Sequence, residues 1–153
     1  MTAYVSILIS AGFDKFEEII NASPRQAKEG YFKRRSIRTK VSTNRFLKPG
    51  DKMAQRIEKL FDALKNNDDD ELGEEILRAW LLSKRDLLAN ALDYLDIPHV
   101  NGLSDSDLSK FEKLSNRDVK KLLDHLKQIA SDEDIKIYFE FMGVPHTETL
   151  FKH

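Results

Sequence analysis

The sequence predicts an all-α protein, built as a bundle or a short stack of antiparallel helical hairpins. Apolar residues recur at helical spacing through most of the chain, and several of these stretches follow a serine with an acid or glutamine three residues later. The chain has only four prolines and six glycines in 153 residues, which argues against a turn-rich β protein. This length is that of one ordinary domain, so we expect residues 1–153 to form a single helical domain.

The composition sets limits on chemistry and location. The absence of cysteine excludes disulfides, Cys-based zinc sites and a thiol nucleophile. The apolar stretch at residues 3–13 lacks a positive segment before it and is followed by Asp14, Glu17 and Glu18, unlike a signal peptide. It is also far shorter than the ~20 apolar residues of a membrane span. We therefore expect a cytoplasmic protein that makes no contact with membranes.

The N-terminal third divides into a helix and a connector. An apolar stripe predicts that residues 1–22 form one core-facing first helix; it consists of Val5, Leu8, Ile9, Phe13, Phe16, Ile19 and Ile20. Residues 23–50 form an extended basic connector, which opens with a start signal for a second helix, Ser23-Pro24-x-Gln26. That helix should be short, because Gly30 interrupts it. Alternating β-branched and polar residues at 36–43 then predict extended chain or a short strand.

Residues 51–153 are predicted to form a helical body. Asp51 caps a helix over residues 52–65, an acidic run at 66–71 breaks it, and the next helix carries apolar residues from Leu72 to Leu82. A capping box at Ser83 and Asp86 starts another helix, which ends at Pro98 and Gly102. A short helix over residues 104–114 follows. Two more helices begin at residues 115–116 and at the Ser131-x-x-Asp134 box, the first ending near Ala130 and the second near Met142, before Gly143 and Pro145.

One stretch of the body occurs twice. "LDYLDIPH" at residues 92–99 returns 47 residues later as "FEFMGVPH" at 139–146. The same shift aligns Leu72 with Val119, Ile76 with Leu123, Ala79 with Leu126 and Leu82 with Ile129, which defines possible repeats at 71–103 and 118–150. A period in the mid-forties suits a two-helix solenoid unit, but helix-rich sequences also align with one another by chance. The sequence leaves both interpretations open.

The histidines and acidic runs have a chemical and a structural interpretation. His99 and His146 each follow a proline and could be metal ligands or an acid–base pair, but a histidine also suits the negative end of a helix dipole. The runs at 68–71 and at Asp105-x-Asp107 lack the array of a calcium loop and suit helix N-termini. Without a phosphate loop or nucleophile elbow, we expect no catalytic, metal or cofactor site, although dispersed catalytic groups would escape this reasoning.

The strongest individual feature is the basic connector. Residues 25–52 carry ten basic and two acidic side chains, a net charge of +8, whereas the other residues together carry −9. This segment could clasp its own acidic body or hold a protein partner, or it could bind nucleic acid by neutralising phosphates and stacking aromatic rings on bases. We expect a non-enzymatic protein-interaction or adaptor module, which uses the basic connector or a helical groove to hold a protein partner or to self-associate. The alternative is nucleic-acid binding by the basic segment 25–48. The candidate binding residues are Arg25, Lys28, Tyr31, Phe32, Lys33, Arg34, Arg35, Arg38, Lys40, Arg45, Phe46 and Lys48.

Overall fold

A computed structural model describes residues 3–34, 49–66, 69–100, 102–103, 108–145 and 147–151. The regular structure of these residues is helical, which confirms the predicted all-α fold. They form two compact units, residues 1–80 and 81–153, and the boundary falls near the end of one helix. The single domain expected over residues 1–153 stays a prediction. Within the described ranges, no helix combines the length and apolar character needed to cross a membrane.

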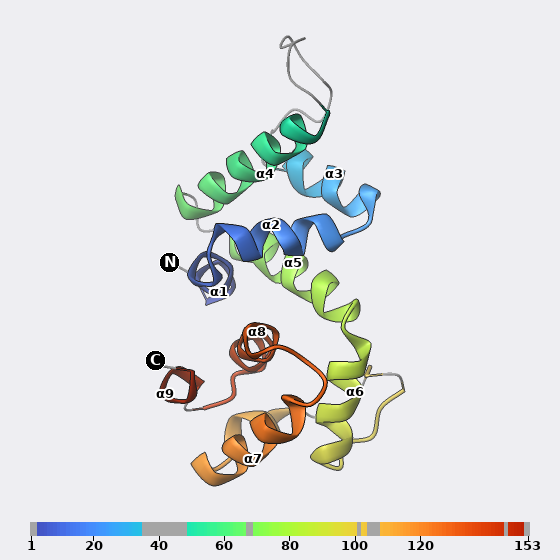
Figure 1. The fold of residues 1–153 in the computed structure, drawn as a ribbon, viewed down its shortest axis with the longest axis vertical. Helices are drawn as coiled ribbons and strands as arrows, with labels where there is room; N and C mark the ends of the chain where they lie inside the picture. The colour runs from blue at the N-terminus through green and yellow to red at the C-terminus, as the bar shows by residue number, and fades with distance from the viewer. Residues whose placement is uncertain are drawn as a thin grey trace. The chain divides into compact units, whose positions relative to one another are not determined.

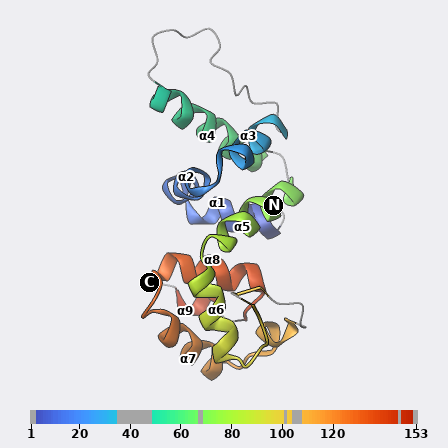
Figure 2. The same cartoon turned by 90° about the vertical axis from the view of Figure 1, so that its right-hand side faces the viewer.

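Unit 1 is an assembly of helices, whose arrangement Figures 1 and 2 show. It contains α1 (Ala3–Ala11), α2 (Phe13–Ala22), α3 (Arg25–Arg34), α4 (Pro49–Asn66) and most of α5 (Asp70–Leu82). Helix α4 contacts α1, α2 and α3, and α1 also contacts α2. The core side chains come from all five helices and include Leu8, Phe16, Phe32, Leu60 and Ile76, each fully buried.

The prediction of one helix over residues 1–22 is wrong. The chain breaks between α1 and α2 at Gly12, whose φ of +93° lies in the region that favours glycine. The apolar stripe continues across the break, because Val5 and Leu8 of α1 and Phe16 and Ile19 of α2 are all fully buried. A stripe alone therefore could not reveal the break.

The connector contains more helix than the sequence predicts. Helix α3 follows Pro24 as expected, but it continues through Gly30 to Arg34 instead of ending there. Tyr31 and Phe32 are buried directly after this glycine, and their burial offsets the roughly 1 kcal/mol by which glycine disfavours a helix. Residues 25–34 are therefore not extended, while the alternating stretch at 36–43 lies outside the described residues.

Helix α4 also starts earlier than the sequence predicts. It begins at Pro49, so Asp51 lies in its first turn instead of at its N-cap. Proline suits a first helical position, because its fixed φ matches the helix and its missing N–H would have no helical partner there.

Unit 2 contains α6 (Arg85–Tyr94), the 3₁₀ helix η1 (Ser109–Lys113), α7 (Asn116–Leu126), α8 (Asp132–Met142) and α9 (Thr147–Leu150). Helix α6 contacts α7, and α8 contacts α9. The starts predicted at 115–116 and 131 are confirmed: Ser115 and Ser131 accept backbone hydrogen bonds from residues 118 and 134 at 3.1 and 3.2 Å. The capping box predicted at Ser83 is wrong, because the N-cap of α6 is Lys84, whose side chain makes no capping hydrogen bond.

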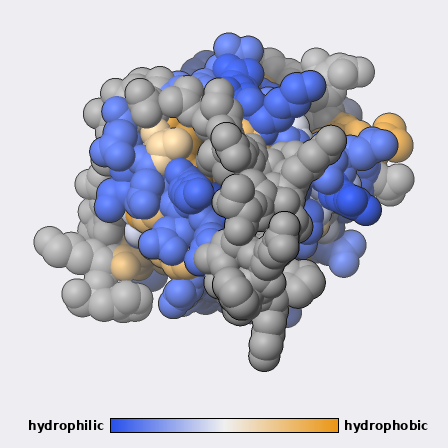
Figure 3. Space-filling model, turned by 90° about the horizontal axis from the view of Figure 1, so that it is seen from above, coloured by the Kyte–Doolittle hydropathy of each residue, from blue (hydrophilic) through white to orange (hydrophobic). Residues whose placement is uncertain are grey.

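The two units differ in which large apolar side chains they expose. Among the described residues, the exposed large apolar side chains all lie in unit 2: Leu82, Tyr94, Val100, Leu103 and Ile129. Figure 3 shows one face of the molecule, on which the coloured residues are mostly hydrophilic and hydrophobic ones occupy small separate areas. Two of the exposed apolar residues of unit 2, Val100 and Leu103, lie on the same loop.

Candidate functional site

The repeated sequence ends two helices in the same way. At the end of α6, the Ile97 amide donates to the Leu92 carbonyl at 2.9 Å, and the Asp96 amide donates to the Asp93 carbonyl at 3.1 Å. At the end of α8, Val144 donates to Phe139 at 2.9 Å and Gly143 donates to Glu140 at 3.3 Å. This pair of bonds is a Schellman motif, in which the residue after the helix adopts left-handed backbone.

The left-handed positions of the two motifs are equivalent in the 47-residue shift. Asp96 has a φ of 57° and Gly143 a φ of 75°. The residues that follow them, Ile97 and Val144, are both 6% exposed, as the hydrophobic contact of this motif requires. The repeated sequences therefore encode the same helix end. A full duplication of 71–103 and 118–150 stays a prediction.

After the first of these ends, His99 fixes a loop. We call residues 97–103 the 97–103 loop; Asn101 within it lies outside the described residues. The Gly102 amide donates to Nδ1 of His99 at 3.0 Å, and Nε2 of His99 lies 2.6 Å from Oδ1 of Asp93. Because Nδ1 accepts a hydrogen bond, the proton of the neutral ring is on Nε2, which donates it to Asp93. His99 thus connects α6 to the far side of the loop.

Gly102 brings the loop onto α6. Its φ is +85°, and a Cβ at this position would lie 2.7 Å from the Cβ of Leu88 and 3.2 Å from the Arg85 carbonyl oxygen. Only glycine allows the backbone to approach α6 so closely with this conformation. The loop is therefore held at both sides, by a glycine packed on the helix and by a histidine that bridges to Asp93.

The loop presents two apolar side chains to solvent. Val100 and Leu103 form an isolated antiparallel bridge, with reciprocal amide–carbonyl hydrogen bonds of 2.8 and 3.0 Å. Directly paired residues of an antiparallel bridge place their side chains on the same face, roughly 5 Å apart at Cβ. Val100 is 75% exposed and Leu103 is 46% exposed, so this bridge presents two apolar side chains to solvent.

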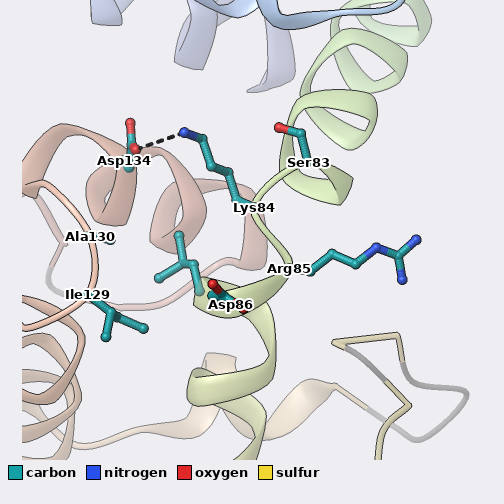
Figure 4. A pocket seen from close by; sticks show the side chains of 8 residues that line it. Ser83, Lys84, Arg85, Asp86, Ile129, Ala130 and Asp134 are labelled. Atoms are coloured by element: carbon teal, nitrogen blue, oxygen red, sulfur yellow. Dashed lines mark ion pairs between the residues drawn. The ribbon is translucent and has the colours of Figure 1, made fainter.

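A polar depression of about 300 Å³ lies elsewhere in unit 2, between two helical corners (Figure 4). Ser83, Lys84, Arg85, Asp86 and Leu87 line one side, and Ile129, Ala130 and Asp134 line the other. Nζ of Lys84 lies 3.6 Å from Oδ2 of Asp134, whose side chain is 13% exposed. In Figure 4 Lys84 extends toward Asp134, whereas Arg85 points away from it. The ion pair spans the depression between the two corners.

Arg34 of the basic connector binds acidic residues of the helical body. Arg34 donates from Nε to Oδ2 and from Nη2 to Oδ1 of Asp69, both at 3.1 Å, and Nη2 lies 3.3 Å from Oε2 of Glu71. These contacts raise the pKa of Arg34, chiefly through the hydrogen bonds with Asp69. Arg34 is therefore engaged within unit 1, as the intramolecular clasp predicts for this one residue.

The other candidate residues of the connector divide into three groups. Tyr31 and Phe32 are 2% and 0% exposed, so they anchor α3 in the core and present no ring for stacking on a base. Lys33 is exposed, Lys28 is half-buried, and Arg25 pairs with Glu29 on the surface of the same helix. The remaining candidates lie outside the described residues: Arg35, Arg38, Lys40, Arg45, Phe46 and Lys48.

Two residues of the acidic run accept hydrogen bonds from three helices of unit 1. Asp69 accepts a hydrogen bond from the Leu72 amide at 3.2 Å and caps α5 while it holds Arg34. Oδ1 of Asp70 accepts from the amides of Tyr4 and Val5 at 2.7 and 3.1 Å, so it caps α1. The helix-terminus interpretation of this run is confirmed at both residues, while Asp68, Asp105, Asp107 and His146 lie outside the described residues. Within the described ranges, no three acidic or histidine side chains gather as a metal site.

No protein family, curated protein or solved structure matches this chain. The assignment of function therefore depends on the geometry of the chain itself.

Sequence reasoning missed the 97–103 loop, although part of its signal is present. From the sequence alone, His99 is either a residue of a helix exit or a metal or acid–base residue, and Gly102 is a helix terminator. The spacing of Pro98, His99 and Gly102 around Val100 marks a short turn, but only the structure shows that Gly102 packs against Leu88. That contact depends on where the chain travels in space, which local patterns do not encode.

Proposed function

We propose that this chain is a non-enzymatic protein-interaction module, and that the 97–103 loop is its contact site. The single observation that carries the proposal is the exposure of Val100 and Leu103 on a backbone held by His99 and Gly102. Covering such side chains with a partner contributes about 1.5–3 kcal/mol for each that becomes fully buried.

The construction of the loop supports this proposal. A fixed loop loses less conformational entropy on binding than a mobile one, so more of the contact energy remains as affinity. The exposed side chains contribute little to the stability of unit 2, because they stay in water after folding. The contacts of Gly102 and His99 therefore position two side chains whose burial would contribute free energy mainly when a partner covers them.

A photo-crosslinking experiment tests the proposal. The photoreactive residue p-benzoylphenylalanine replaces Val100 in the full-length chain, which is expressed and irradiated in its native cells. We expect a protein adduct of discrete mass, with a yield that falls when Leu103→Ser is added. The matched control carries the same photoreactive residue at Lys120, an exposed position of α7 in the same unit. Equal yields at positions 100 and 120, or no adduct from either, would refute the proposal.

A further inference from the structure

The stretch of sequence that contains the 97–103 loop is acidic. Residues 86–109 contain five aspartates and no glutamate, lysine or arginine, a net charge of −5. Of these aspartates, the described Asp86, Asp93 and Asp96 are exposed, and the Asp93 side chain remains 72% exposed while it pairs with His99. Two cations lie next to this stretch: Arg85 is exposed, and Nζ of Lys110 donates to the Leu95 carbonyl. The apolar pair of Val100 and Leu103 thus belongs to a segment with excess negative charge.

The same chain contains a segment of complementary composition. Residues 35–48, "RSIRTKVSTNRFLK", carry five basic and no acidic side chains. They also include four large apolar residues, Ile37, Val41, Phe46 and Leu47. A surface that combines an apolar centre with a charged rim selects a partner with apolar anchors and the opposite charge.

We propose that residues 35–48 of a second copy of this chain bind to the 97–103 loop. The proposal rests on the proposed function, because it names the partner of that same contact site. In this complex, apolar residues of the segment cover Val100 and Leu103, and its arginines and lysines face the neighbouring aspartates. The chain therefore associates head to tail, with the basic segment of one copy on the acidic loop of another.

Charge complementarity selects this segment as the occupant. The association state distinguishes a second copy from the same copy, because a segment bound to its own chain would leave the protein monomeric at every concentration.

Sedimentation velocity of the purified full-length chain tests the proposal. We expect concentration-dependent self-association that weakens with salt, because exposed charge pairs are screened. The double variant Val100→Ser/Leu103→Ser should raise the dissociation constant about ten-fold or more. Leu82→Ser is the matched control, since Leu82 is an equally apolar and 41% exposed residue of unit 2 outside the loop, and it should leave association unchanged.

One further variant and a peptide-binding experiment identify the charges and the occupant. Asp96→Asn removes one negative charge at a position whose left-handed backbone asparagine also tolerates, and it should reduce the salt dependence of association. A labelled peptide with the sequence of residues 35–48 should bind the full-length chain, whereas a peptide with its four large apolar residues replaced by serine should bind at least about ten-fold more weakly. Far-UV circular dichroism and thermal unfolding check that each protein variant is folded.

The outcomes separate this proposal from the proposed function. A chain that stays monomeric at all concentrations overturns the second copy, and so does self-association that survives the Val100→Ser/Leu103→Ser change. If position 100 then crosslinks to a different protein, the loop is still a contact site and only the second copy is wrong. If position 100 crosslinks to nothing, both proposals are wrong.

Discussion

Opposite substitutions at Asp96 and Gly143 should change stability in opposite directions. Both residues occupy the left-handed position of a Schellman motif, with φ of 57° and 75°. Left-handed backbone is unfavourable for a residue with a Cβ by roughly 1–2 kcal/mol, although aspartate tolerates it better than most. Asp96→Gly therefore relieves an unfavourable conformation, whereas Gly143→Ala creates one.

The structure allows the two magnitudes to be worked out. In Gly143→Ala the new Cβ lies 3.3 Å from Cγ of Glu112, a flexible side chain that can move. The backbone penalty of roughly 1–2 kcal/mol is partly offset by about 0.5–1 kcal/mol of lower unfolded-state entropy, which leaves a loss of about 1 kcal/mol. Asp96→Gly reverses these contributions and also removes a negative charge from the C-terminal end of α6, worth roughly 0.3–1 kcal/mol. Because aspartate tolerates left-handed backbone better than alanine does, the backbone gain is smaller than the penalty in Gly143→Ala, and we expect a net gain in stability of up to about 1 kcal/mol.

Urea unfolding followed by far-UV circular dichroism measures both changes as shifts in midpoint at constant slope. Gly30→Ala is the matched control, because Gly30 lies within α3 and a Cβ there would meet no atom within 4 Å. Alanine should stabilise this helical site by about 1 kcal/mol. A loss of stability in Asp96→Gly equal to that in Gly143→Ala would sink the claim that the two helix ends have equivalent backbone.

Three other predictions concern both units. Gly73→Ala should destabilise unit 1 despite the better helix propensity of alanine, because the new Cβ would lie 3.1 Å from the Val5 amide nitrogen. The fluorescence of Trp80, the single tryptophan, reports this unfolding. A stabilised variant would contradict the close packing of α1 on α5. Burial raises the pKa of Tyr138, so the folded state favours the neutral phenol. The contribution of this group to the free energy of unfolding should be complete below about pH 10 and should fall by about 1.4 kcal/mol per pH unit above it. The variant Tyr138→Phe should reduce that fall. If the basic connector binds nucleic acid, its affinity for labelled duplex should fall with salt at a log–log slope of roughly −0.9 per phosphate neutralised. The double variant Arg35→Ala/Arg38→Ala should flatten this slope, whereas Arg34→Ala should leave it unchanged because Asp69 holds Arg34. Equal effects of the two variants would contradict this assignment of the phosphate contacts.

The parts of the fold that could be predicted depend on contacts between near neighbours in the sequence. Ser115 and Ser131 cap helices through amides three residues away, and both starts were predicted correctly. The apolar stripes also identified the core, including Trp80 and Phe61. The break at Gly12 was missed because hydrophobic spacing carries no information on φ, and α1 and α2 bury the same stripe that one continuous helix would bury.

The candidate site was harder to predict for a different reason. Its components are near in sequence, but their roles depend on packing: Gly102 matters because it meets Leu88, and His99 because it lies between Asp93 and the Gly102 amide. The acidic run shows the same limit. Its preference for helix N-termini was predictable, whereas the capping of α1 by Asp70 joins residues more than sixty positions apart.

The repeated Pro-His sequence encodes a helix-ending turn in both copies, but the candidate contact site in only one of them. In both copies, a left-handed residue and a buried Ile or Val end the helix, so selection for this turn alone can account for the shared apolar and proline positions. His99 does more than end a helix, because it also accepts the Gly102 amide that brings Val100 and Leu103 to the surface. The residue that makes this use possible is Gly102, and its counterpart 47 positions later is Thr149, a β-branched residue. A close glycine approach of the kind made by Gly102 is therefore not encoded in the second copy, and any contact function of the loop belongs to the first.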